Sequence, residues 1–173
     1  LEKIPDARRS IRFFIVEGGK VIENLPTKIK TFSNLFFYSD LNVLKEPMDI
    51  IHIGSTLQYI EDWQELLSLL IEKYTPKYFV FSDLLAGNIS TFATSQIYYD
   101  KKIPSWFFSF SDVLNFFENK KFHYLYSEKY TNKILGQDIV FPNHDFPLEY
   151  RIDCPINVVF KRSEEHTSEL QSH

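Results

Sequence analysis

The sequence has little cysteine and little glycine, and it has no long apolar run. Its 173 residues include one cysteine, Cys154, and five glycines. A single cysteine excludes a disulfide framework and a cysteine-based zinc site, and it fits a reducing compartment. No apolar run approaches the roughly 18–20 residues of a membrane-spanning helix, and the first residues lack the apolar core of a signal peptide. We therefore expect a cytoplasmic protein without a membrane span.

The sequence also lacks a strong excess of charge once its end is set aside. Residues 163–173 resemble the translation of a common sequencing adapter, and we expect this tail to be foreign to the protein. Without the three Glu residues of the tail, 19 basic residues stand against 20 acidic ones. The basic residues form short clusters and no long stripe, so the sequence predicts no nucleic-acid partner.

Apolar and aromatic residues are plentiful. Apolar residues make up 44% of the chain, charged residues make up 24%, and there are 17 Phe and 10 Tyr. This composition excludes bulk disorder, and the length suits one α/β domain over residues 1–162. Short apolar runs predict strands that are buried on both faces. These runs are Ile11–Val16, Leu35–Tyr38, Ile50–Ile53, Tyr78–Phe81, Tyr124–Tyr126 and Ile156–Phe160.

Apolar residues at helical spacing lie between several of these runs. The spacing predicts helices over Trp63–Tyr74 and Ser111–Asn119. We expect Glu61 and Asp62 to cap the first helix, and Ser111 or Asp112 to cap the second. Strands that alternate with helices are typical of an α/β fold with a mainly parallel sheet.

Polar residues follow four of the predicted strands directly. In parallel sheets, ligands bind at the carboxyl ends of the strands, where loops and helix N-termini line a crevice. The sequence therefore favours a ligand site built from these exits. They are Glu17, Ser39 with Asp40, the segment from Ser55 to Tyr59, and Asp83.

The segment Asp49–Asp62 resembles the fourth strand and the following loop of class I S-adenosylmethionine-dependent methyltransferases. Phe13–Glu17 is similar to their second strand, and Tyr78–Asp83 is similar to their fifth. The resemblance covers residues 11–161 and implies a Rossmann-like sheet with helices on both faces. Three further segments resemble one uncharacterised methyltransferase-like family found beside polysaccharide-biosynthesis genes: Thr94–Tyr99, Ile103–Phe108 and Ile156–Phe160.

The resemblance implies S-adenosylmethionine as the cofactor. Glu17 would accept hydrogen bonds from the two ribose hydroxyls, and Ser39 and Asp40 would bond the adenine amino group. The methionine side would be lined by the loop after the fourth strand, whose aromatic and apolar side chains suit a sulfonium cation. That loop comprises Ser55, Thr56, Leu57, Gln58 and Tyr59.

The resemblance also implies a small-molecule or sugar-containing methyl acceptor. Asp83 and His144 are candidates for the base that takes a proton from the acceptor. Gln96, Tyr98 and Tyr99 are candidates for binding a hydroxyl-rich substrate. Each of these side chains also has an ordinary interpretation as part of the surface. His52 lies inside an apolar run and reads as a core histidine, and we assign no metal site.

One family feature is missing. The family opens with a strand and a G-x-G turn, whereas here Gly18 and Gly19 follow Glu17 and no such motif precedes it. The resemblance therefore implies an N-terminally truncated domain that lacks its central first strand, binds cofactor weakly and is inactive. A non-catalytic Rossmann-like module for protein interaction is the alternative. A flavodoxin-like or receiver-like fold is a weaker third hypothesis, because no acidic cluster follows a first strand.

Overall fold

A computed structural model describes residues 11–98, 100–131, 133–134, 137–138 and 141–164. The chain divides into two compact units between Glu46 and Pro47. Within the described ranges, no helix has both the length and the apolar character needed to cross a membrane.

The first unit is a parallel pair of strands joined by two short helices. Phe13 lies opposite Leu35 and Val16 lies opposite Tyr38, and this pairing confirms both predicted strands. The rings of Phe14 and Phe36 stack with their centroids 5.2 Å apart. The elements are β1 (Phe13–Val16), α2 (Gly19–Glu23), α3 (Thr27–Lys30), β2 (Leu35–Tyr38) and the 3₁₀ helix η1 (Leu41–Val43).

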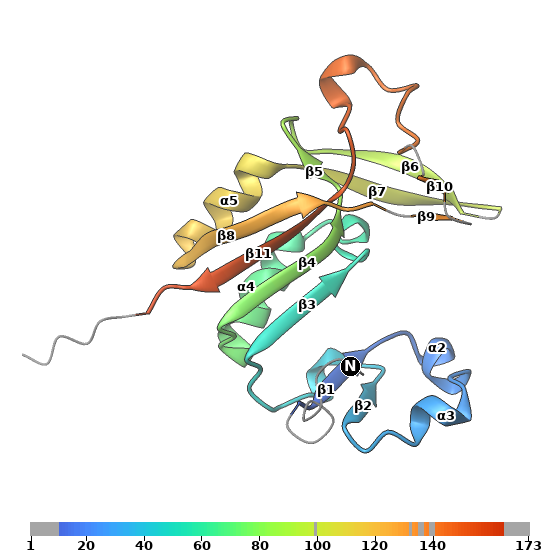
Figure 1. The fold of residues 1–173 in the computed structure, drawn as a ribbon, viewed down its shortest axis with the longest axis vertical. Helices are drawn as coiled ribbons and strands as arrows, with labels where there is room; N and C mark the ends of the chain where they lie inside the picture. Colours follow the sequence, from blue (N-terminus) through green and yellow to red (C-terminus); the bar gives the residue numbers. More distant parts are fainter. Residues whose placement is uncertain (1–10, 99, 132, 135–136, 139–140, 165–173) are drawn as a thin grey trace, which may run out of the picture. The chain divides into compact units, whose positions relative to one another are not determined.

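The second unit contains a four-stranded sheet in the order β3-β4-β11-β8 (Figure 1). β3 and β4 are parallel, whereas β11 is antiparallel to both β4 and β8. The sheet is therefore mixed, and the expected mainly parallel arrangement is not confirmed. The predicted burial on both faces is also wrong for this sheet, because Ile50 is 57% exposed and Tyr126 is 52% exposed. A short apolar run indicates a strand but carries no signal for its direction or for what covers its second face. The strands are β3 (Ile50–Gly54), β4 (Tyr78–Leu84), β8 (Phe122–Lys129) and β11 (Ile156–Arg162).

Two helices accompany this sheet, α4 (Trp63–Tyr74) and α5 (Phe110–Asn119). The bounds of α4 are those predicted from its apolar spacing, and Asp62 holds its N-cap position without a side-chain capping bond. The predicted cap of α5 is wrong. Ser109 caps it, and its hydroxyl accepts a hydrogen bond from the Asp112 N–H at 3.2 Å. Asp112 instead stands in the first turn, where its charge favours the helix N-terminus.

Both helices lie on the same face of the sheet. Phe117 of α5 is fully buried, and its ring lies 5.2 Å from the ring of Phe79 and 4.1 Å from that of Phe160. α4 meets α5 through Trp63 and Phe116, whose ring centroids are 5.4 Å apart. The expectation of helices on both faces is therefore not confirmed within this unit.

A second, three-stranded sheet extends the unit and was not predicted from the apolar runs. The long strands β6 and β7 form an antiparallel hairpin, and β5 pairs with β7 in parallel. Gly87 lies so close to Ile152 that an added Cβ would stand 2.7 Å from its Cγ2, so this position requires glycine. The elements are β5 (Ala86–Gly87), β6 (Phe92–Tyr98), β7 (Lys101–Ser109), the pair β9 (Lys133–Ile134) and β10 (Gln137–Asp138), and the 3₁₀ helices η2 (Leu57–Tyr59) and η3 (Leu148–Tyr150).

Candidate functional site

The parallel pair of the first unit brings two predicted site residues to the same end. Glu17 and Ser39 directly follow Val16 and Tyr38, which are partners in register. The Glu17 N–H donates to the Tyr38 carbonyl at 3.0 Å, and both side chains are exposed. Asp40 is also exposed, and its Oδ1 accepts a hydrogen bond from the Asn42 N–H at 2.8 Å. Asp40 therefore caps η1.

The parallel pair of the second unit brings two further predicted residues into direct contact. Gly54 lies opposite Ser82, so Ser55, which directly follows β3, stands beside Asp83, the second-last residue of β4. The Ser55 hydroxyl donates to Asp83 Oδ2 at 2.6 Å, and the Ser55 N–H donates to the Ser82 carbonyl at 3.0 Å. A short bond to a carboxylate is a charge-assisted one, and such bonds hold both partners in place.

Both residues of this pair have left-handed backbone. The φ angle is 47° at Ser55 and 59° at Asp83. Such a conformation costs a non-glycine residue roughly 1–2 kcal/mol, and strain of this kind gathers at functional sites. The two strained residues are hydrogen-bonded to each other at the carboxyl ends of β3 and β4. We therefore take the Ser55–Asp83 pair as the centre of the candidate site.

A polar network continues from this pair across the sheet. The Asp83 N–H donates to Asn157 Oδ1 at 3.3 Å, and Asn157 Nδ2 donates to Glu128 Oε1 at 3.2 Å. The Tyr126 hydroxyl donates to Glu128 Oε2 at 2.6 Å. Sequence reasoning missed these three side chains. Asn157 gave one signal, because it is the polar residue inside the apolar run Ile156–Phe160.

The network changes the proton affinity of its members. The hydrogen bond from Tyr126, followed by the bond from Asn157, holds the pKa of Glu128 below its usual value. The same bond to Glu128 raises the pKa of Tyr126, and desolvation adds to this rise. Glu128 therefore stays ionised at neutral pH and adds a second carboxylate to the network at this end of the sheet.

Part of the loop after β3 is buried. Thr56 Oγ1 donates back to the Gly54 carbonyl at 2.7 Å. Leu57 and Gln58 are only 1% and 5% exposed, so their side chains support the loop from inside. Gln58 Oε1 is buried and has no hydrogen-bond partner in the described part of the chain. A buried acceptor without a donor carries a desolvation cost that a donor on a ligand would remove.

The loop also contacts the β6–β7 hairpin. The Tyr59 hydroxyl donates to Gln96 Oε1 at 3.0 Å, and η2 lies against β7. This bond joins a predicted cofactor residue to a predicted acceptor residue. Tyr98 is the last residue of β6, and only its backbone is described. Tyr99 lies outside the described residues.

Neither His144 nor His52 has a described hydrogen bond or ion pair with Ser55 or Asp83. His144 is exposed in the loop after β10, and its Nε2 lies 3.4 Å from Asp145 Oδ1. His52 is exposed on β3 and its Nε2 lies 2.9 Å from Ser82 Oγ, so its interpretation as a core histidine is wrong. Alternate side chains of β3 point to a face that is exposed, and His52 lies on that face. Among the described residues, no group of three or more His, Cys, Asp and Glu side chains could bind a metal ion.

The sequence matches no family model and no curated protein. The structure is similar to an S-adenosylmethionine-dependent methyltransferase of Clostridium acetobutylicum, with 13% identity, a TM-score of 0.55, and coverage of 88% of this chain and 76% of that one. A Mesorhizobium loti methyltransferase of the same class has 14% identity, a TM-score of 0.53, and coverage of 87% and 80%. A Listeria monocytogenes protein assigned to that class has 10% identity, a TM-score of 0.60, and coverage of 88% and 80%.

The chain has the fold of these methyltransferases. The resemblance first seen in Asp49–Asp62 is confirmed at this level, because the likeness spans most of the chain. At identities of 10–14%, the neighbours show the fold alone. What the site does has to be argued from its own residues.

Proposed function

We propose that the chain is part of an S-adenosylmethionine-dependent methyltransferase that acts on a small-molecule or sugar-containing acceptor. The observation that carries the proposal is the Ser55–Asp83 pair. Two polar residues at the exits of neighbouring parallel strands are hydrogen-bonded at 2.6 Å, and both have left-handed backbone. In a fold shared with methyltransferases, this end of the sheet is where a ligand is expected.

The exposed and orphaned polar groups fit this cofactor. Glu17 is an exposed carboxylate that can accept from two neighbouring ribose hydroxyls, and Ser39 and Asp40 stand at the same end of the first unit. In the second unit, Gln58 Oε1 is a buried acceptor without a partner among the described residues, which suits a donor such as the amino group of methionine. The partly exposed ring of Tyr59 suits a sulfonium.

When bound, S-adenosylmethionine supplies an activated methyl group on a sulfonium. The protein then has to align the acceptor, exclude water and take a proton from the attacking hydroxyl. We assign the last task to Asp83. The bond from Ser55 falls on Oδ2, which orients the carboxylate and leaves Oδ1 to face the acceptor hydroxyl. Gln96 is positioned by Tyr59, and with Tyr98 and Tyr99 it would bind further hydroxyls of the acceptor.

We further propose that the domain is completed by a strand that precedes β1 in the full-length protein. Within the described ranges, β1 pairs with β2 and β3 pairs with β4, so each keeps one edge without a strand. Ile50 on β3 is 57% exposed, which is unusual for a strand at the centre of an α/β sheet. Until those edges are covered, we expect weak cofactor binding and no turnover.

Calorimetric titration with S-adenosylmethionine tests both proposals. Residues 1–173 should bind with a Kd weaker than micromolar, whereas the chain extended by its upstream reading frame should bind at micromolar Kd. Glu17→Gln in the extended chain should weaken binding, while Glu23→Gln, a matched change in the same unit, should not. Micromolar binding by residues 1–173 would contradict the missing strand. A folded, extended chain that does not bind would contradict the methyltransferase and favour the non-catalytic module.

A further inference from the structure

The four-stranded sheet has one covered face and one open face. On the covered face, where α4 and α5 lie, the central side chains of β4 and β11 are at most 1% exposed: Phe79, Phe81, Val158 and Phe160. On the other face, Ile50 is 57% exposed and Tyr126 is 52% exposed. Within the described ranges, no helix of the second unit lies on this open face (Figure 1).

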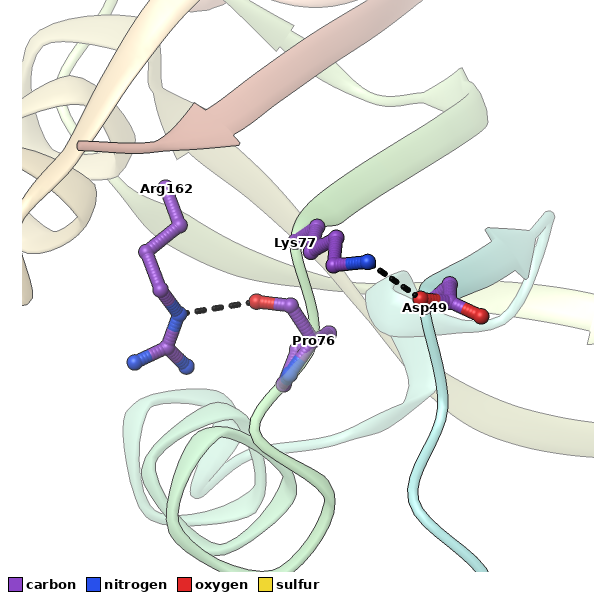
Figure 2. Close-up of polar contacts among 4 residues, drawn as sticks. All are labelled: Asp49, Pro76, Lys77 and Arg162. Carbon is purple, nitrogen blue, oxygen red and sulfur yellow. Dashed lines mark hydrogen bonds and ion pairs between the residues drawn. The ribbon is translucent and has the colours of Figure 1, made fainter. Parts of the chain in front are cut away.

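The strand register defines the open face, because partners on paired strands point to the same side of a sheet. One row crosses all four strands through successive partners: His52, Val80, Val159 and Tyr126. A second row contains Ile50, Tyr78 and Lys161. Charged groups bound the face beyond this second row, where β3 and β4 begin and Lys77 pairs with Asp49 at 2.9 Å (Figure 2).

The sequence of these strands is typical of strands that are covered on both sides. A strand with one side in water alternates apolar and polar residues, whereas a strand buried on both sides is a continuous apolar run. The run Tyr78–Phe81 on β4 shows no alternation, and Val158 and Val159 are neighbours on β11. Val80 and Val159 are nevertheless only partly buried. The open face therefore has the residues of a buried face without the cover.

The handedness of parallel crossovers indicates what reaches the open face. Such crossovers are right-handed in about 98% of cases. The crossover from β3 to β4 contains α4, which lies on the covered face. The strand proposed above would pair in parallel with the free edge of β3, and the crossover from it to β1 would run away from β4. A right-handed crossover in that opposite direction lies on the opposite side of the sheet, which is the open face.

We propose that the segment preceding β1 in the full-length protein forms a layer of helices on the open face. The inference rests on the strand of the proposed function and adds its cover. A parallel crossover needs a dozen or more residues, and ten residues precede Ile11, so the proposed segment includes residues upstream of Leu1. The crossover helix lies over the added strand and β1. Packed helices are about 8–10 Å apart, which is roughly two strand spacings, so a second helix, ahead of the added strand, lies over β3 and β4.

The chemistry of recognition is apolar. The second helix would contact Ile50 and Val80, so it needs apolar residues at positions i, i+3, i+4 and i+7 along one side. The upstream reading frame should therefore contain such a pattern ahead of an apolar strand. A reading frame without it would overturn the proposal.

Thiol labelling tests the packing directly. Ile50→Cys and Val80→Cys each place a thiol on the open face, and mass spectrometry follows the reaction of that peptide with iodoacetamide. Both thiols should react in residues 1–173. In the upstream-extended chain, both should react about tenfold more slowly or less, because a packed helix leaves reaction only through local opening. Protection of Ile50→Cys alone would mean that a strand covers the edge without a helix layer, and it would overturn the proposal.

Leu69→Cys is the matched control, because Leu69 is 44% exposed on α4, on the other side of the sheet. It should react equally in the two chains. Equal reaction of Val80→Cys in the two chains would overturn the proposal, and so would protection that is lost on dilution, which would mean that a second copy covers the face. The measurement needs no cofactor. An unprotected extended chain that binds S-adenosylmethionine would reject this inference alone, whereas a protected chain that does not bind it would reject the methyltransferase alone.

Discussion

The two ends of the β3-β4-β11-β8 sheet have charged groups of opposite sign. The two sets of charges are stabilised by different kinds of partner. At the carboxyl ends of β3 and β4, the carboxylates of Asp83 and Glu128 accept hydrogen bonds from Ser55, Asn157 and Tyr126, which are all neutral donors. At the opposite end, the ammonium groups of the lysines pair mainly with carboxylates.

This difference determines what each end can do. A neutral donor stabilises a carboxylate without cancelling its charge. The first end therefore keeps two negative groups that can accept a proton, or a hydrogen bond from a hydroxyl. An ion pair cancels most of the field of a cation, so the described ion pairs weaken the field of the lysines at the second end. One sheet thus presents a candidate proton acceptor at one end and paired charges at the other.

The largest effect should come from Asp83→Asn. This change keeps the shape of the side chain and its contact with Ser55 but removes the charge that would take a proton. Loss of a general base lowers kcat by about 10²–10⁴-fold. Release of S-adenosylhomocysteine by the upstream-extended chain, with an acceptor that supports turnover, measures the effect.

Asp49→Asn is the matched control for this prediction. Asp49 stands just before β3 at the opposite end of the sheet, and its carboxylate pairs with Lys77 at 2.9 Å. Its replacement should lower the pKa of Lys77, which the hydrogen bond to Asp49 raises, and leave kcat unchanged. Equal rates for the Asp83 and Asp49 variants would remove Asp83 from the chemistry.

A smaller but still large effect is expected from Asn157→Asp. The new carboxylate would face the Glu128 carboxylate and the Asp83 backbone N–H, and the donor to Glu128 would be lost. We expect the variant to lose unfolding free energy at pH 7, measured in urea. Repulsion raises the folded-state pKa of the new carboxyl, so the loss should appear as the pH rises above its unfolded pKa of about 3.9 and shrink below that pH. Asn88→Asp, at an exposed position, should change little, and equal losses at pH 4 and 7 would contradict the like-charge explanation.

Much of the fold could be predicted from the sequence, because the signals for helices and strands come from residues close together in the chain. The spacing of Trp63, Leu67, Leu70 and Ile71 defines one face of a helix, and α4 has the predicted bounds. Strands β1 to β4 and β11 coincide with short apolar runs. The direction of β11 and the β6–β7 hairpin could not be predicted, because pairing depends on partners far away in the chain.

The candidate site was predictable in its parts but not in its connections. Ser55 and Asp83 follow apolar runs, which is a local signal, whereas their hydrogen bond spans 28 residues of sequence. Asn157 is 74 residues from Asp83, so no spacing rule could have joined them. The cap of α5 was mistaken because Ser109, Ser111 and Asp112 all suit an N-cap, and only the start of the helix distinguishes them.

Glycine substitutions compare backbone strain at the two ends. Lys121 has a φ of 61° in the turn between α5 and β8, and Ser55 has a φ of 47°. Lys121→Gly should raise the unfolding free energy by about 0.5–1 kcal/mol through relief of that strain. Ser55→Gly gains similar relief but loses the bond to Asp83, worth about 0.5–1.5 kcal/mol, so its net change should be near zero. Thermal unfolding measures both, and clear stabilisation by Ser55→Gly would show that the bond to Asp83 contributes little.

The smallest effect concerns Tyr126→Phe, which removes a hydroxyl and leaves the ring. The bond from this hydroxyl is the main cause of the lowered pKa of Glu128, so the pKa should return toward its ordinary value. A carboxyl with a lowered folded-state pKa adds stability above its unfolded pKa, and this stability is lost as the pH falls through the folded value. The variant should therefore show a weaker dependence of stability on acid. Tyr124→Phe is the matched control, because the Tyr124 hydroxyl lies 2.8 Å from Ser127 Oγ and makes no described bond to a carboxylate. Carboxyl NMR titrations that move equally in the two variants would show that the Tyr126–Glu128 bond does not control the charge at this end of the sheet.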